Sequence, residues 1–386
     1  MQNVNLKTLP PLSLYIHIPW CIKKCPYCDF NSHQKNSDIN EDLYIDSLLK
    51  DLELSLPSIW GRMINSIFIG GGTPSLFSGR SINKLLVNVR SLLKLSPFVE
   101  ITMEANPATI ETEFLAEYSE AGVNRISLGI QSFNNKHLQL LGRVHDEKQS
   151  NLAIEKAKQY FNNINLDLMF GLPHQTIVDL EQDVLLAKKF NCQHLSYYNL
   201  TIEPNTLFAK NMPSNLPNND LCYDMQIYIV ENLAKDGYNR YEVSAYAKDG
   251  YQAKHNLNYW LFGDYLGIGC GAHSKLSFFD KIIRQVRHKH PETYMQKVFN
   301  NEHIIEDNNI LIKDLPFEFM LNSLRLLDGF ATNLFSERTG LSLNTILTKL
   351  QQAQQQKLLN LEFNKITPTV FGINFLNDLL INFLSD

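Results

Sequence analysis

Six short apolar runs alternate with amphipathic helical patterns in the first part of the chain. Each run is rich in β-branched or aromatic residues and is bounded by Gly, Pro or Asn, which is typical of strands. Between the runs, apolar residues recur at helical spacing, as at Ile82, Leu85 and Val89. This alternation predicts βα units and a parallel sheet. The predicted strands are Ser13–Ile18, Ser66–Gly70, Glu100–Glu104, Arg125–Gln131, Ile164–Met169 and His194–Tyr198.

Two of the predicted helices carry a capping signal at their start. Asp146 stands three residues before Gln149, and Thr176 three before Asp179, so each pair can form a capping box. Gly122 suits the end of the helix before the fourth strand, because glycine readily adopts the left-handed conformation found there. The pattern alone leaves a doubly wound sheet and a barrel both open.

Residues that can bind cofactors or take part in a reaction gather where the predicted strands end. In βα barrels the chemistry lies at the C-terminal ends of the strands, on the loops that follow. With six strands instead of eight, we predict an α/β fold with an open, partial (β/α)6 TIM-like barrel. The residues concerned are Cys21, Cys25 and Cys28 after the first strand, Gly70-Gly71-Gly72-Thr73-Pro74 after the second, Glu104 and Gln131 ending the third and fourth, and Asp167 on the fifth.

The C-terminal region follows a different pattern, with helices separated by short β-like runs. We therefore expect a first domain over residues 1–280 and a small, helical, winged-helix-like domain over residues 281–386. The expected helices are Leu315–Leu327, Thr345–Leu359 with Asn344 as its cap, and Asn374–Leu384.

Composition narrows the class of protein. Of 386 residues, 44% are hydrophobic and 19% charged, so a sizeable core is expected and wholesale disorder is not. The net charge is −5 and no block of Lys or Arg occurs, which argues against nucleic acid as a partner. No secretory signal and no bilayer-spanning apolar run are visible. Six cysteines in such a chain suit a reducing compartment, so we expect a cytoplasmic location.

The three N-terminal cysteines carry the strongest chemical signal. Cys21, Cys25 and Cys28 have the spacing C-x3-C-x2-C, and three thiolates can hold a 4Fe–4S cube that keeps one iron open. An open iron can serve radical chemistry with S-adenosylmethionine (SAM). Zinc bound together with His17 or His33, or a redox pair of cysteines, remains an alternative at this point.

Polar residues near the other strand ends could complete a nucleoside site. The glycine run lets a ligand approach the main chain, and its carbonyls could accept hydrogen bonds from an ammonium group. The Arg143 guanidinium suits a carboxylate, and Asp167 would be costly to bury unpaired in an apolar strand. Glu104 and Gln131 complete the set, although structural ion pairs would explain single members equally well.

These segments together resemble the radical SAM superfamily, within the branch that holds oxygen-independent coproporphyrinogen III oxidase and a family of heme chaperones. The resemblance covers nearly the whole chain. Its motifs are Tyr15-Ile16-His17-Ile18-Pro19, the cysteine run, Gly71-Gly72-Thr73-Pro74, Arg125-Ile126-Ser127-Leu128-Gly129-Ile130-Gln131-Ser132-Phe133, Leu141-Gly142-Arg143-Val144-His145, Asp167-Leu168-Met169-Phe170-Gly171-Leu172-Pro173 and His255-Asn256-Leu257-Asn258-Tyr259-Trp260.

The resemblance implies a set of cofactor-binding residues. The three cysteines would hold a 4Fe–4S cluster whose fourth iron meets SAM, and Tyr27 would lie beside the adenine. It also implies the open barrel and the helical C-terminal domain. The positions that match SAM contacts of the oxidase are Tyr15, Gly71, Gly72, Thr73, Glu104, Gln131, Arg143 and Asp167.

Two departures separate the chain from the oxidase and favour the chaperones. The oxidase carries a fourth cysteine where this chain has Phe30, and it has a long N-terminal extension that this chain lacks. The segment from His255 to Trp260 resembles a motif linked to heme binding in the chaperones. Imidazole is a common ligand of heme iron, and Tyr259 and Trp260 offer flat faces for a macrocycle. A purely structural role for His255 stays open.

We therefore predict a heme chaperone that carries a 4Fe–4S cluster and SAM and passes heme to acceptor proteins, membrane-associated hemoproteins included. A homodimer is one option for its assembly, and the sequence leaves the oligomeric state open. The alternatives are an oxygen-independent coproporphyrinogen III oxidase or another radical SAM enzyme, and whether SAM is cleaved stays open. Cys192 and Cys222 are expected to be small buried hydrophobic residues. Cys270 is expected to be a stray thiol, with a place beside heme as the alternative, and the sequence assigns no role to His145 or His273.

Overall fold

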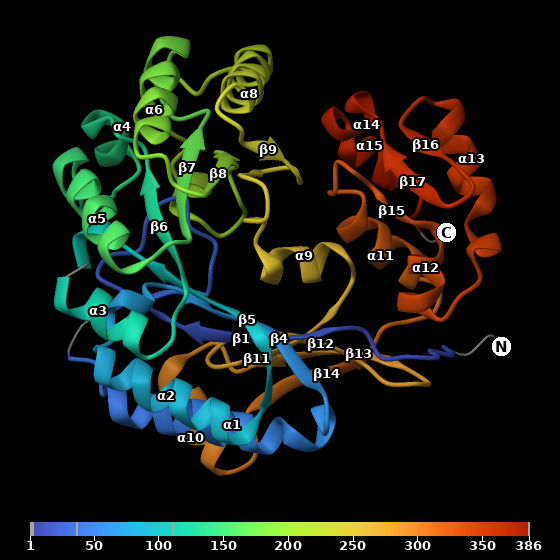
Figure 1. Ribbon diagram of the computed structural model, residues 1–386, viewed down its shortest axis with the longest axis horizontal. Helices are drawn as coiled ribbons and strands as arrows, with labels where there is room; N and C mark the ends of the chain where they lie inside the picture. The colour runs from blue at the N-terminus through green and yellow to red at the C-terminus, as the bar shows by residue number, and fades with distance from the viewer. Residues whose placement is uncertain (1–3, 36–37, 110–111, 385–386) are drawn as a thin grey trace.

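Twelve strands form one open, mixed sheet in the computed structural model, which describes residues 4–35, 38–109 and 112–384 (Figure 1). The order is β14-β13-β12-β11-β1-β4-β5-β6-β7-β8-β10-β9, so the first and last strands do not meet. The predicted open, partial barrel is confirmed. Its six central parallel strands are β1 (Leu12–Ile18), β4 (Met63–Gly71), β5 (Lys94–Ala105), β6 (Arg125–Gln131), β7 (Ile164–Phe170) and β8 (His194–Asn199).

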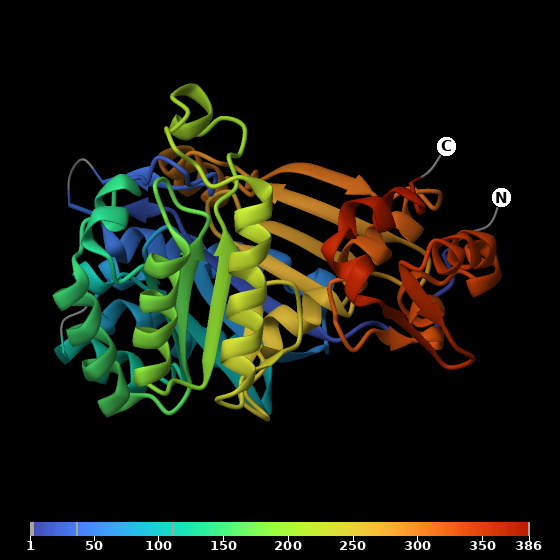
Figure 2. The ribbon, with the colours of Figure 1, turned by 90° about the horizontal axis from the view of Figure 1, so that it is seen from above.

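Helices cover the outer face of these strands (Figures 1 and 2). Both predicted capping boxes are present, at Asp146 with Gln149 and at Thr176 with Asp179. The helices are α1 (Glu41–Ile59), α2 (Gly79–Leu92), α3 (Thr112–Glu120), α4 (Asn135–Leu140), α5 (Glu147–Tyr160), α6 (Ile177–Lys189), α7 (Leu207–Lys210) and α8 (Asn219–Ala234), with short turns of helix at η1 (Pro74–Leu76) and η2 (Pro107–Thr109).

The barrel strands alternate between an apolar outer face and a polar inner face. In β1, Leu14 and Ile16 belong to the core under the helices, whereas Tyr15 and His17 line an interior cavity. The register carries this alternation across the sheet, because Tyr15 lies opposite Phe68 of β4, which lines the same cavity. The interior of this barrel is therefore a place for ligands and not an apolar core.

The sheet continues beyond the barrel and past the domain boundary that we expected at residue 280. That position falls between β12 and β13, which pair antiparallel, so we propose that the C-terminal domain begins after Asn309 instead. In Figure 2 the orange strands of this extension reach toward the C-terminal domain. The added elements are β9 (Asn239–Arg240), β10 (Ala245–Ala247), α9 (Lys254–Trp260), β11 (Asp264–Ile268), β12 (His273–Ser277), β13 (Ile282–Arg287), α10 (Pro291–Phe299) and β14 (Ile304–Asn309).

The C-terminal domain has its own core, built around Phe319, Phe330 and Phe335. Its helices are shorter than the sequence predicts. Asn344 caps no helix, because it lies inside η3, where the Ser342 side chain provides the cap. The elements are α11 (Leu315–Ser323), β15 (Phe330–Ala331), α12 (Thr332–Thr339), η3 (Leu343–Thr345), α13 (Leu347–Gln355), β16 (Leu359–Leu361), β17 (Lys365–Pro368), α14 (Val370–Asn374) and α15 (Leu376–Ile381).

A buried ionic cluster joins the sheet extension to the barrel. The carboxylate of Asp51 on α1 accepts hydrogen bonds from Arg287 at 3.2 Å, from the Tyr294 hydroxyl at 2.9 Å and from the Gly269 amide at 3.0 Å. The side chains of Asp51 and Arg287 are fully buried. This cluster fixes β13 and α10 against the helix that follows the cysteine loop.

Candidate functional site: a cysteine pocket beside an aromatic cavity

A pocket of about 330 Å³ opens at the C-terminal ends of the barrel strands, and we call it the cluster pocket. The loop between β1 and α1, which includes the short pair β2 (Trp20–Cys21) and β3 (His33–Gln34), brings Cys21, Cys25 and Cys28 to its wall. Eight further predicted residues line the same pocket. They are Tyr27, Gly71, Gly72, Thr73, Glu104, Gln131, Arg143 and Asp167.

The three thiols share this wall and are not paired in disulfides. Burial raises the pKa of the Cys21 and Cys28 thiols. Within the described ranges, no three His, Cys, Asp or Glu side chains are gathered closely enough to hold a metal ion as they stand. The cysteine loop supplies the three thiolates that a cube with one open iron needs, and binding would require the thiols to converge.

Arg143 ties the cysteine loop to the end of β6. Its Nη1 donates to Cys25 Sγ at 3.7 Å and its Nη2 donates to the Gly129 carbonyl at 2.7 Å. Its Nε is buried without a hydrogen-bond partner. A buried donor left unpaired costs free energy, so this nitrogen suits an acceptor on a bound ligand. The donor set therefore fits an anionic group beside the cysteines.

The zinc alternative lacks its fourth ligand. The Nδ1 of His17 lies 2.9 Å from the Tyr15 hydroxyl, and its Nε2 lies 2.8 Å from the Asn31 carbonyl oxygen. The Nε2 of His33 lies 3.0 Å from the carbonyl oxygen of Lys289. Neither histidine lines the cluster pocket.

Main-chain hydrogen bonds join the glycine run to the cysteine loop. The Gly72 amide donates to the Ile18 carbonyl, and the Thr73 amide to the Trp20 carbonyl, both at 2.7 Å. A Cβ on Gly72 would lie 2.6 Å from the Trp20 carbonyl oxygen, so only glycine allows this approach. The two loops therefore hold each other in place.

Two half-buried carboxyl groups face the pocket, one from β5 and one from β7. Glu104 accepts a hydrogen bond from the Gly71 amide at 3.0 Å, and Asp167 accepts from Ser127 at 2.7 Å. Burial, followed by the charge of Asp167, raises the pKa of Glu104 to about 7. Burial also raises the pKa of Asp167. Both acids would gain from a cation in the pocket, which would favour their charged forms.

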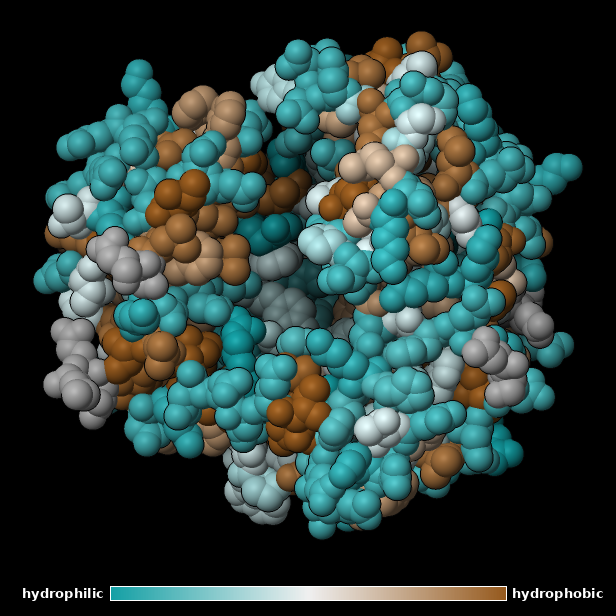
Figure 3. Space-filling model, turned by 180° about the vertical axis from the view of Figure 1, so that it is seen from behind, coloured by the Kyte–Doolittle hydropathy of each residue, from teal (hydrophilic) through white to brown (hydrophobic). Residues whose placement is uncertain are grey.

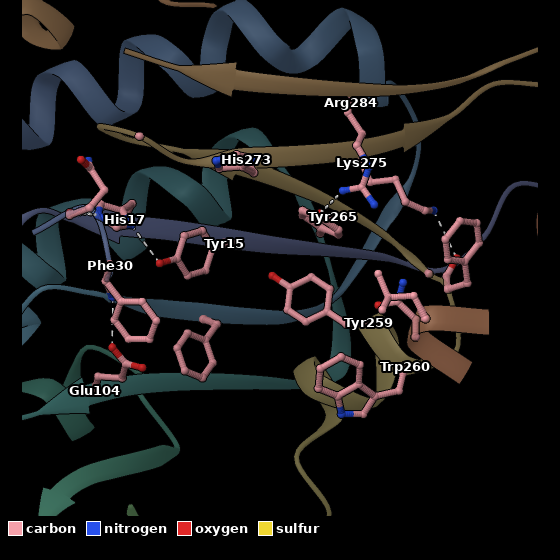
Figure 4. A pocket seen from close by; sticks show the side chains of 18 residues that line it. Tyr15, His17, Phe30, Glu104, Tyr259, Trp260, Tyr265, His273, Lys275 and Arg284 are labelled. Carbon is pink, nitrogen blue, oxygen red and sulfur yellow. Dashed lines mark hydrogen bonds between the residues drawn. The ribbon is translucent and has the colours of Figure 1, made fainter. Parts of the chain in front are cut away.

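A second cavity of about 550 Å³ adjoins the cluster pocket, and we call it the aromatic cavity (Figure 4). Phe30, Gly71 and Glu104 line both spaces. The aromatic cavity also reaches the C-terminal domain, where α11 contributes two side chains. The face of the molecule in Figure 3 is hollowed between the two domains. The other lining residues used below are Tyr15, His17, Phe68, Tyr259, Trp260, Tyr265, His273, Lys275, Arg284, Leu321 and Asn322.

The predicted heme motif divides between the cavity and the core. Tyr259 and Trp260 line the aromatic cavity, but His255 does not. The His255 side chain is buried, with Nδ1 3.0 Å from Ser66 Oγ and Nε2 2.9 Å from the Tyr259 hydroxyl. Burial lowers its pKa to about 3. With both ring nitrogens bonded to the protein, His255 has no free position for an iron.

Tyr15 also departs from its expected place, because it lines the aromatic cavity and not the cluster pocket. Sequence reasoning missed Phe68, Tyr265 and Arg284, which face the same cavity. These three strands are almost continuously buried, so the sequence carries no clear polar and apolar alternation that would mark their inner faces. Only the pairing of the strands shows which of their side chains face the cavity.

The described part of the chain contains no helix with the length and apolar character needed to cross a bilayer.

Family models match both domains. The radical SAM superfamily matches residues 15–187, and the HemN C-terminal domain matches residues 312–375. A solved structure of coproporphyrinogen III oxidase, HemN, from Escherichia coli superposes with a TM-score of 0.82 over 97% of this chain and 90% of that one. Its sequence is 23% identical, so this likeness speaks for the fold. Fold and cysteine loop together define a radical SAM core, a class whose members carry a 4Fe–4S cluster and SAM.

Full-length relatives narrow the assignment. A protein from Haemophilus influenzae named heme chaperone HemW is 47% identical, and the match covers 98% of this chain and 99% of the relative. The heme chaperone HemW of Escherichia coli is 46% identical, with the same coverage of both chains. The chain belongs to the HemW family.

Proposed function

We propose that this protein binds heme in the aromatic cavity and passes it to acceptor proteins, while a 4Fe–4S cluster and SAM occupy the cluster pocket. The names of the HemW relatives support the function, and the shape and lining of the cavity support the location. Membrane-associated hemoproteins are among the acceptors we propose. The free state of all six cysteines supports a reducing, cytoplasmic setting.

The observation that carries the proposal is an aromatic cavity directly beside the cysteine pocket. Flat apolar rings bury a macrocycle well, and tyrosine and tryptophan leave a polar edge for its substituents. A cavity of about 550 Å³ lies within the usual size range for a cofactor site. The Arg284 guanidinium lines one side and would favour a carboxylate of a porphyrin.

We assign Cys21, Cys25 and Cys28 to the cluster and the other lining residues of the cluster pocket to SAM. When bound, a cluster with an open iron supplies a coordination site and an electron for SAM. Arg143 would meet the carboxylate of SAM through its unpartnered Nε. Glu104 and Asp167 would accept hydrogen bonds from its ammonium or its ribose hydroxyls.

The test is a titration of the anaerobically reconstituted protein with hemin, followed by absorbance, and then by transfer to an apo-hemoprotein. Leu321, on α11, is half-exposed at the cavity wall, so Leu321→Trp should fill the entrance and weaken heme binding. Val370→Trp places the same ring at an exposed site away from the cavity and is the matched control. Unsaturable hemin binding by the wild type would contradict the proposal.

The oxidase alternative is tested on the same preparation. Conversion of coproporphyrinogen III to protoporphyrinogen IX, with cleavage of SAM, would make the chain an enzyme of porphyrin synthesis. We expect no such conversion, because Phe30 stands where the oxidase has its additional cysteine.

A further inference from the structure

We propose that His273, and not His255, provides the axial ligand to the iron of heme in the aromatic cavity. The inference rests on the proposed heme binding and adds the residue that holds the metal. His273 begins β12, and its side chain lies across the cavity from Glu104 and Trp260 in the view of Figure 4.

Most other side chains of the cavity that could bind iron are already bonded to the protein. His17 uses both ring nitrogens, and the Tyr15 hydroxyl is one of its partners. The Tyr259 hydroxyl bonds to His255, and the Tyr265 hydroxyl accepts a hydrogen bond from Arg284 at 3.1 Å. Removing any of these from its partner would leave a buried polar group unpaired, at a cost in free energy.

The Lys275 ammonium is also already bonded to groups of the protein. Its Nζ lies 2.8 Å from an Asp264 carboxylate oxygen and donates to the Phe262 carbonyl at 3.2 Å. The side chain is almost fully buried, so this ion pair holds the ammonium away from an incoming ligand.

His273 differs from all of these. Within the described residues, its ring nitrogens make no hydrogen bond to the protein, and the residue is exposed where it lines the cavity. Imidazole is a common axial ligand of heme iron, and the ring nitrogens of His273 are free to take that place.

This assignment gives His255 a different part. It positions Tyr259, whose hydroxyl it holds at 2.9 Å, while Ser66 fixes the other side of the imidazole. The motif from His255 to Trp260 would then shape the aromatic wall without touching the iron.

The experiment is hemin binding to the full, anaerobically reconstituted chain labelled with ¹⁵N-histidine. Absorbance titration gives the affinity, and pulsed electron paramagnetic resonance gives the coupling between iron and a histidine nitrogen. The variants are His273→Ala, His255→Gln and, as a control, His290→Ala, which removes an exposed imidazole outside the cavity. Because His273 is exposed, its replacement should not disturb folding, and added imidazole provides a rescue of the truncated variant.

We expect His273→Ala to lose the histidine coupling and to bind hemin about tenfold or more weakly, a change of at least 1.4 kcal/mol. The other two variants should keep the coupling, and imidazole should restore it in His273→Ala. Unchanged coupling in His273→Ala, or loss in His255→Gln alone, would overturn the inference and leave the proposed heme binding standing. Failure of the wild type to bind hemin would overturn both.

Discussion

The half-buried carboxyl group of Glu104 should make the stability of this protein depend on pH in a definite direction. Glu104→Gln removes the charge and keeps a side-chain oxygen that can accept the hydrogen bond from the Gly71 amide. The pKa of Glu104 is raised from 4.5 to about 7 in the folded chain, chiefly by burial. The folded state thus disfavours the carboxylate, whereas the unfolded chain ionises freely.

This difference in the pKa of Glu104 between the folded and unfolded chain sets the direction of the pH dependence of stability. Above pH 4.5 the Glu104 carboxyl ionises in the unfolded chain before it ionises in the folded chain, so the free energy of unfolding falls as the pH rises. The fall ends above the folded pKa of about 7. Linkage with these two pKa values gives a cost of about 1 kcal/mol at pH 5.5 and about 3 kcal/mol at pH 8. The Gln variant avoids this cost, so its advantage over the wild type should grow by about 2 kcal/mol between the two pH values.

The assay is urea unfolding of the iron-free chain at both pH values, for wild type and variant. Titrating groups that do not interact with Glu104 affect both proteins alike and cancel in the difference. Asp167, which contributes to the pKa of Glu104, serves as a second probe, because Asp167→Asn should reduce the effect. An advantage of Glu104→Gln that stays constant with pH would refute the reasoning.

Two further substitutions test the packing around the site. Arg287→Met leaves the buried carboxylate of Asp51 without its ion-pair partner and should cost about 3–5 kcal/mol in urea unfolding; Arg80→Met, which breaks an exposed pair, should cost less than about 1 kcal/mol. Gly72→Ala forces the glycine run away from the cysteine loop and should weaken SAM binding by about tenfold or more in equilibrium dialysis. Gly61→Ala is the control outside the pocket: its positive φ of 74° makes alanine strained there, so it should lower the stability but leave SAM binding unchanged.

The sequence predicts the barrel well because each strand is a short run of β-branched or aromatic residues bounded by turn residues, and helical patterns separate these runs. It fails for the extension after residue 260, where burial hides the pattern. In β12 the side chain of Lys275 is buried by an ion pair with Asp264, eleven residues earlier, so a charged residue stands at an inner position. No local rule identifies such a strand before its partner is known.

The sequence also predicts only part of the candidate site. Spacing and strand ends bring the cysteines, the glycine run and the two acids to one pocket. The placement of His255 could not be predicted, because its Nδ1 is bound by Ser66, 189 positions away in the chain. The role we infer for His273 also needs the structure, since only a view of the whole cavity reveals which side chains are already engaged.

An iron-edge anomalous difference map from crystals of the reconstituted protein with bound heme tests the central claim most directly. The account predicts two iron sites, one beside Cys21, Cys25 and Cys28 and one in the aromatic cavity next to His273. A heme iron found outside the aromatic cavity would contradict the account.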